Sequence, residues 1–152
     1  MGYPVPAKSA RLSAAESIMC VFARDEDTSF GAGKLGSELS QLQSAMTALN
    51  EHSFFAFNEP LTATSPTECC ILSREILCAV KTRGCRGIWV THIHELHSDT
   101  DEINKALPGG DIFSLRTAVK EDKMDEFSIV SGIPSGGSGA QEVFDRLKSV
   151  VK

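Results

Sequence analysis

Two short stretches of the sequence end in side chains that could hydrolyse a nucleotide. The stretch FFAFNEPLTATSP (residues 54–66) carries an apolar run that leads directly to Asn58 and Glu59. The stretch GIWVTH (87–92) ends in the same manner at His92. A glutamate beside a phosphate can polarise an attacking water, and a neighbouring histidine can hold the terminal phosphate. The two stretches therefore predict a hydrolytic site, provided that the fold brings their ends together.

The segments around these residues predict a βαβ unit. Both stretches begin as short apolar runs, which is typical of strands buried on both faces. Between them, SPTE (65–68) is a capping box with proline at the first helical position, and it predicts a helix over 66–82 that ends at Gly84. Such a unit makes the two strands parallel, so Glu59 and His92 would lie on the same edge of the sheet, where α/β folds bind ligands.

The segments before this unit predict one more strand and one more helix. The run IMCVFA (18–23) is apolar and partly β-branched, as a buried strand should be. The stretch SELSQLQSAMTALN (37–50) is predicted to be a helix with Ser37 as its N-cap. Apolar residues at helical spacing predict the buried faces of this helix and of the helix over 66–82: Leu39, Leu42, Met46 and Leu49 in the first, and Ile71, Leu72, Ile76, Ala79 and Val80 in the second.

The last third of the chain differs in character. A short helix is expected within residues 97–110, and the segments 113–119 and 126–132 read as an antiparallel hairpin. A last helix is predicted over 139–151, because a second capping box precedes an apolar stripe. Together these elements predict a single α/β domain over residues 1–152, with parallel core strands, flanking helices and a C-terminal hairpin.

The composition limits the class of protein. The chain has 152 residues, a hydrophobic fraction of 41% and a net charge of −5, which argues against general coating of nucleic acid. It contains no apolar run long enough for a membrane helix and no apolar signal core at its start. The five cysteines show no disulfide or zinc-finger spacing, which favours a cytoplasmic protein with reduced thiols.

Two other kinds of site deserve comparison with the first. The cluster THIHELH offers His92, His94, Glu95 and His97 as metal ligands, but its spacing does not match H-E-x-x-H. The stretch GAGKLGS (31–37) has the composition of a phosphate-binding loop but not its spacing, and it follows a loop rather than a strand. A metal-dependent hydrolase therefore remains an alternative, and the chain alone cannot complete a P-loop site.

The order of these pieces resembles the ATPase domain of the MutS family of DNA mismatch-repair proteins, a branch of the ABC-type ATPases. Over about 140 residues, the stretch FFAFNEPLTATSP resembles the Walker B strand and the D-loop that follows it. GIWVTHIHEL resembles the strand of the switch histidine, and FSIVSGIPSGGSGAQEVFDRL resembles the closing segment of that domain. The segment 27–50 resembles the signature segment, of which Glu38 and the apolar stripe fit closely.

The resemblance implies a role for each matching residue. Glu59 would be the catalytic base of ATP hydrolysis, His92 the switch at the γ-phosphate, and Asn58 would stand at the position of the Walker B acid beside Mg²⁺. Thr64 and Ser65 would belong to the D-loop at a homodimer interface. The helix start near Ser37 would face the ATP of the partner subunit.

The same resemblance implies the setting of the chain. It would be the C-terminal part of a partial P-loop NTPase sheet of the ABC/RecA-like type, with the P-loop and the domains that bind mismatched DNA lying upstream of residue 1. Neither ATP nor Mg²⁺ is then expected to bind this chain tightly. Because Asn58 is neutral where the family has an acid, the alternative is a degenerate relative that binds partners without efficient hydrolysis.

Overall fold

The structure, a computed structural model, describes residues 8–22, 33–120 and 123–133, together with Phe144 and Lys148. Three parallel strands form one sheet in the order β1-β2-β3, with β1 at Ser17–Phe22, β2 at Ser53–Asn58 and β3 at Arg86–Val90. The predicted α/β class, with parallel core strands, flanking helices and a hairpin, is confirmed. Among the described residues, no helix is long and apolar enough to cross a membrane.

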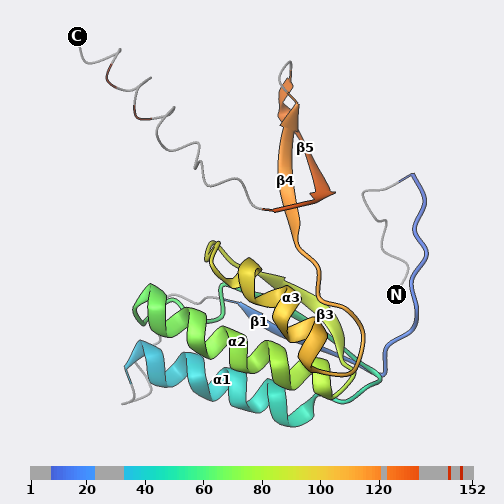
Figure 1. Cartoon of the computed structure of the whole chain (residues 1–152), viewed down its shortest axis with the longest axis vertical. Coiled ribbons are helices and arrows are strands. Elements are labelled where there is room, and N and C mark those ends of the chain that lie inside the picture. The colour runs from blue at the N-terminus through green and yellow to red at the C-terminus, as the bar shows by residue number, and fades with distance from the viewer. Residues whose placement is uncertain (1–7, 23–32, 121–122, 134–143, 145–147, 149–152) are drawn as a thin grey trace.

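Helices connect the strands and cover one face of the sheet. Helix α1 (Lys34–Ala48) joins β1 to β2, and helix α2 (Pro66–Thr82) joins β2 to β3. The two helices lie side by side against the sheet, and α3 (Leu96–Ala106) packs on α2 (Figure 1). Strands β4 (Leu115–Lys120) and β5 (Lys123–Ser131) form an antiparallel hairpin that extends away from these layers (Figure 1).

The core lies between the sheet and the helices. In β2 every second residue is buried, and the ring of Phe57 is only 1% exposed. This ring lies 5.1 Å from the ring of Phe55 and meets the edge of Trp89 on β3 at 5.7 Å. A Cβ atom at Gly87 would stand 2.3 Å from the Phe55 ring, so β3 requires a glycine where this ring crosses it.

Several element boundaries follow the prediction closely. Strand β2 matches it, and α2 begins with Ser65 as N-cap, Pro66 in its first turn and both halves of the capping box present. Gly84, with a φ of 70°, follows the last turn of α2. Strand β3 ends two residues earlier than expected, at Val90. Capping chemistry is a local signal, and α2 obeys it. The strands were predicted to be buried on both faces, and this was wrong, because Ile88 and Val90 of β3 are 54% and 48% exposed and β2 is fully buried on one face only.

The predicted start of α1 was wrong, and its predicted buried face was wrong only at Leu39, because Leu42 and Leu49 are buried and Met46 packs against the core. The helix begins at Lys34 with Gly33 as N-cap, and the Ser37 amide already donates to the Gly33 carbonyl at 3.2 Å. Ser37 is therefore inside the first turn and is not the N-cap. Leu39 is 41% exposed, and Glu38 occupies the buried face in its place. Helix α2 shows a similar shift, because Ile71 is 58% exposed while Cys69, Ser73 and Leu77 are buried.

Two predicted segments cannot be compared with the structure. The helix over 139–151 lies outside the described residues, apart from Phe144 and Lys148, which are helical. Residues 31 and 32 of the stretch GAGKLGS (31–37) also lie outside them. All five cysteines are described and are free thiols, in agreement with the cysteine spacing.

Candidate active site

Two neighbouring strands deliver Glu59 and His92 to the carboxyl end of the sheet. Asn58 is the last residue of β2 and pairs in register with Val90, the last residue of β3. The Glu59 amide donates a hydrogen bond of 2.9 Å to the Val90 carbonyl, which fixes Glu59 beside the end of β3. The Ile93 amide donates to the hydroxyl of Thr91 at 3.1 Å, and this turn carries His92 between them.

The two side chains meet as expected. Nδ1 of His92 lies 2.8 Å from Oε2 of Glu59, a distance at which the pair forms a hydrogen bond or, with a protonated ring, an ion pair. The His92 side chain is 73% exposed and that of Glu59 28% exposed. An exposed pair of this kind contributes only about 0–1 kcal/mol to stability. The pair lies at the carboxyl end of a parallel sheet, the end at which α/β folds bind ligands.

Glu59 has an unusual backbone conformation. Its φ is 48°, and it is the one residue other than glycine with a positive φ in the described part of the chain. A residue with a Cβ atom in this region costs about 1–3 kcal/mol and persists only where its surroundings hold it. This conformation turns the chain just after β2, at the residue whose side chain contacts His92.

Asn58 does not join this pair. It lies in the same row as Phe22 and Val90, on the face of the sheet opposite the helices. Together with these two residues it lines a hollow of about 290 Å³ on that face. Within the described part of the chain, its amide group has no hydrogen-bond partner. Asn58 is thus adjacent to Glu59 in sequence but is directed to a different surface.

Thr64 and Ser65 form the start of α2. The Thr64 hydroxyl donates to the carboxylate of Glu68 at 2.5 Å, and the Ser65 hydroxyl donates to the same oxygen at 2.9 Å. The Glu68 amide donates back to the Ser65 hydroxyl at 3.3 Å. Both predicted site residues therefore cap the helix in this structure. Their contact with a partner subunit stays a prediction.

The capping box gives a testable dependence on pH. The pKa of Glu68 lies below its ordinary value of 4.5, first because of the Thr64 hydroxyl and then because of Ser65. A lowered carboxylate pKa stabilises the fold above the unfolded pKa and loses this effect as the pH falls through the folded pKa. In urea unfolding between pH 7 and 3, the stability difference between wild type and Glu68→Gln should be constant down to about pH 5 and then shrink. Glu75→Gln, an exposed change on the same helix, is the control, and a difference that grows in acid would contradict the assignment.

No site role was predicted for Glu38 from the sequence, yet its buried carboxylate accepts three hydrogen bonds. It is 8% exposed, and its Oε1 accepts from the Thr62 hydroxyl at 2.6 Å. Its Oε2 accepts from the amides of Thr62 at 3.0 Å and Ala63 at 3.1 Å. A sequence signal existed, because position 38 shares a helical face with the buried residues Leu42 and Ala45.

The histidine cluster does not form a metal centre in the described residues. Two of its rings have different partners, since Nδ1 of His97 lies 2.7 Å from the Ser114 hydroxyl and His92 contacts Glu59. Among the residues that the structure describes, no group of three His, Cys, Asp or Glu side chains could hold a metal ion. The metal-hydrolase alternative therefore lacks its ligand set in these residues.

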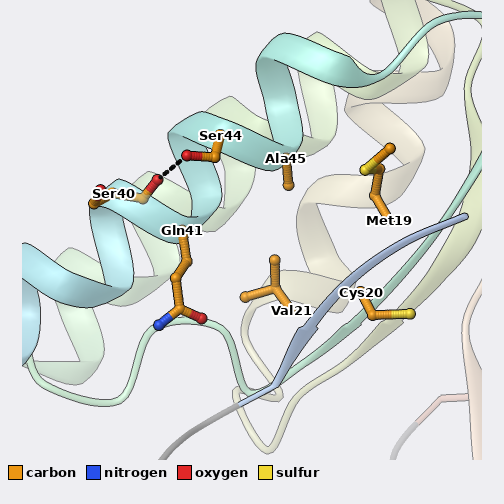
Figure 2. Close-up of a pocket in the computed structure, with 7 residues that line it drawn as sticks. All are labelled: Met19, Cys20, Val21, Ser40, Gln41, Ser44 and Ala45. Carbon is orange, nitrogen blue, oxygen red and sulfur yellow. Dashed lines mark hydrogen bonds between the residues drawn. The ribbon is translucent and has the colours of Figure 1, made fainter. Parts of the chain in front are cut away.

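A second hollow lies away from the Glu59–His92 pair. It has a volume of about 320 Å³ and opens between β1 and α1. Figure 2 shows Met19 and Val21 of β1 facing the helix, where the Ser44 hydroxyl donates to the Ser40 carbonyl at 2.9 Å. The lining carries no ionisable group except the thiol of Cys20, so this hollow has no evident hydrolytic chemistry.

Comparisons with known proteins give one consistent similarity. No protein-family model matches the chain. It is 27% identical over 150 residues to proteins named "Endonuclease MutS2" from two strains of Clostridium perfringens, SM101 and strain 13. The match covers 96% of this chain and 18% of each relative, so the chain spans less than a fifth of the length of the curated relatives it matches. This similarity supports a distant relation to the MutS family.

Proposed function

We propose that this chain is the C-terminal part of a MutS-type ATPase domain in which Glu59 and His92 act on ATP. Glu59 would accept a proton from the water that attacks the γ-phosphorus, and ADP would leave. His92 would donate a hydrogen bond to the γ-phosphate and register its loss. In the whole protein this cycle would be coupled to the binding of mismatched DNA and to a homodimer of ATPase domains.

The observation that carries this proposal is the contact of 2.8 Å between Glu59 and His92 at the carboxyl end of two neighbouring parallel strands. Open α/β sheets bind their ligands at this end. A base and a hydrogen-bond donor on the same rim are the groups that phosphoryl transfer to water needs from this side of the site. The similarity to the MutS2 proteins over 96% of the chain supports the proposed relation to the MutS family.

The opposite face of the sheet supports the idea that this domain has a further part. Parallel sheets in α/β proteins are covered on both faces. Here the face turned away from α1 and α2 carries several exposed apolar side chains, with Ile18 66%, Phe22 51%, Ile88 54% and Val90 48% exposed. An amphipathic helix of the same protein would bury these side chains. We propose that this helix follows the P-loop, which the described residues do not contain.

Magnesium has no ligand set of its own in the described residues. The amide of Asn58 is neutral and lies on the apolar face, and Glu59 is bonded to His92. The proposed reaction therefore uses no metal ion that the described residues of this chain would bind by themselves. Residues of the proposed P-loop part would supply those ligands together with the phosphates of ATP.

A degenerate ATPase that closes on ATP without efficient hydrolysis is the second candidate. It is favoured by Asn58, which stands where an acid would strengthen the hold on Mg²⁺. Comparing Asn58→Asp with Glu59→Ala in a protein that contains the P-loop part would separate the two. A large gain in turnover from Asn58→Asp would favour the degenerate site. No gain, together with loss of turnover in Glu59→Ala, would favour a competent one.

The proposal can be tested by supplying the P-loop part. A chimera would join the segment of the Clostridium perfringens MutS2 protein that precedes the match to this chain. Isothermal titration should give a Kd for ATP in the micromolar range for the chimera. The isolated chain should show no stoichiometric binding in this range. Tight binding by the isolated chain, or none by the chimera, would overturn the proposed division of the site.

A further inference from the structure

Glu38 lies in α1, yet its carboxylate holds the turn that begins at Glu59, after the next strand. This turn covers residues 59–65 and joins β2 to α2. Three donors of the turn point at one buried carboxylate: the Thr62 hydroxyl and the amides of Thr62 and Ala63, at 2.6, 3.0 and 3.1 Å. Hydrogen bonds to a charged acceptor are among the stronger ones in proteins.

Other contacts also hold the turn, but they hold different residues from those that Glu38 binds. Before the turn, the Glu59 amide is bonded to the Val90 carbonyl. In its middle, Leu61 is 2% exposed, and its carbonyl accepts a hydrogen bond from the Cys69 thiol at 3.1 Å. After Leu61, Glu38 is the only side chain outside the turn and α2 that the described residues place in hydrogen-bond contact with Thr62 and Ala63.

Glu59 has a strained φ of 48° between these anchors. Such a conformation relaxes unless the chain on both sides of it is held. The ladder of β2 and the bond to Val90 hold one side, and Leu61 and Glu38 hold the other. Removal of the Glu38 carboxylate leaves the second side held by Leu61 and by the capping box at Ser65, and it frees Thr62 and Ala63 between them.

We propose that Glu38 is a positioning residue for Glu59. Its carboxylate keeps the turn in the shape that directs Glu59 at His92, and it ties this geometry to the first turns of α1. A displacement of α1 relative to the turn would then move the Glu59 carboxylate as well. The significance of this link for catalysis rests on the proposed ATP hydrolysis, whereas the link itself concerns the folded chain alone.

The test uses amide hydrogen exchange on the full chain without nucleotide. In Glu38→Gln, the amides of Thr62 and Ala63 should lose about tenfold or more of their protection, because each loses a charged acceptor. The informative residue is Glu59, whose amide bonds to Val90 and not to Glu38. Its protection should fall as well, and its Cα and Cβ chemical shifts should move away from left-handed values. An unchanged Glu59 signal, with changes confined to Thr62 and Ala63, would overturn the proposal.

Two further variants keep this test decisive. Thr62→Val removes only the hydroxyl bond at 2.6 Å and should produce a smaller change of the same kind if Glu38→Gln does not fold. Glu51→Gln, at an exposed glutamate, should leave the Glu59 signals unchanged. In the chimera, Glu38→Gln should lower kcat and leave KM nearly constant. An inactive wild-type chimera would overturn the proposed ATPase and leave the exchange result standing.

Discussion

Replacing Glu59 with glutamine in the chimera is expected to lower the kcat for ATP hydrolysis by about 10²–10⁴-fold, the contribution of a general base. Glutamine keeps the size of the side chain and can still contact His92, but it cannot accept a proton from water. The KM for ATP should change little, because the phosphates would be held by the P-loop part. Steady-state release of phosphate measures both quantities.

The chain offers a matched control for this variant. Glu51 also lies beside a histidine, with 3.5 Å between its Oε1 and Nε2 of His52, but this pair lies in the exposed turn before β2. Glu51→Gln should therefore leave turnover unchanged. Equal turnover in wild type, Glu59→Gln and Glu51→Gln would show that Glu59 is not the base.

The largest effect on stability is expected at Phe57. Its ring is 1% exposed and contacts both Phe55 and Trp89, so Phe57→Ala removes a buried ring and leaves a cavity. Such changes cost about 3–5 kcal/mol, a large part of the 5–15 kcal/mol that stabilises an ordinary domain. Urea unfolding followed by circular dichroism would measure the loss.

Phe54 is the control on the opposite face of the same strand. It is half-buried and belongs to the face that α1 and α2 do not cover. Phe54→Ala should cost only about 1 kcal/mol in the isolated chain. It should cost more in the chimera if the proposed helix covers this face. If Phe54→Ala and Phe57→Ala lowered the stability of the isolated chain equally, this would contradict the claim that the Phe54 face of the sheet is uncovered.

The sequence was sufficient for the elements whose signals are local. The capping box at Ser65 and the glycine at position 84 set both ends of α2. The placement of Glu59 and His92 on the same edge of the sheet also followed from the sequence, because consecutive parallel strands place their ends together, whereas their direct contact did not.

Other features depended on contacts between distant segments. Helical spacing places position 38 on the buried face of α1, but the donors that satisfy the Glu38 carboxylate come from the turn after β2, and the sequence of α1 cannot reveal them. The direction of Asn58 required the pleat of the finished sheet, which puts Asn58 and Glu59 on different surfaces. The left-handed φ of Glu59 is likewise a result of anchors on both sides rather than of its own residue type.

The central claim, that the Glu59–His92 rim faces the terminal phosphate of ATP, can be tested directly by a crystal structure of the chimera with a non-hydrolysable ATP analogue. We expect the γ-phosphate to lie at the carboxyl ends of β2 and β3, within hydrogen-bond distance of His92, and a water molecule to be hydrogen-bonded to Glu59. A nucleotide bound elsewhere, or a γ-phosphate out of reach of both side chains, would contradict it.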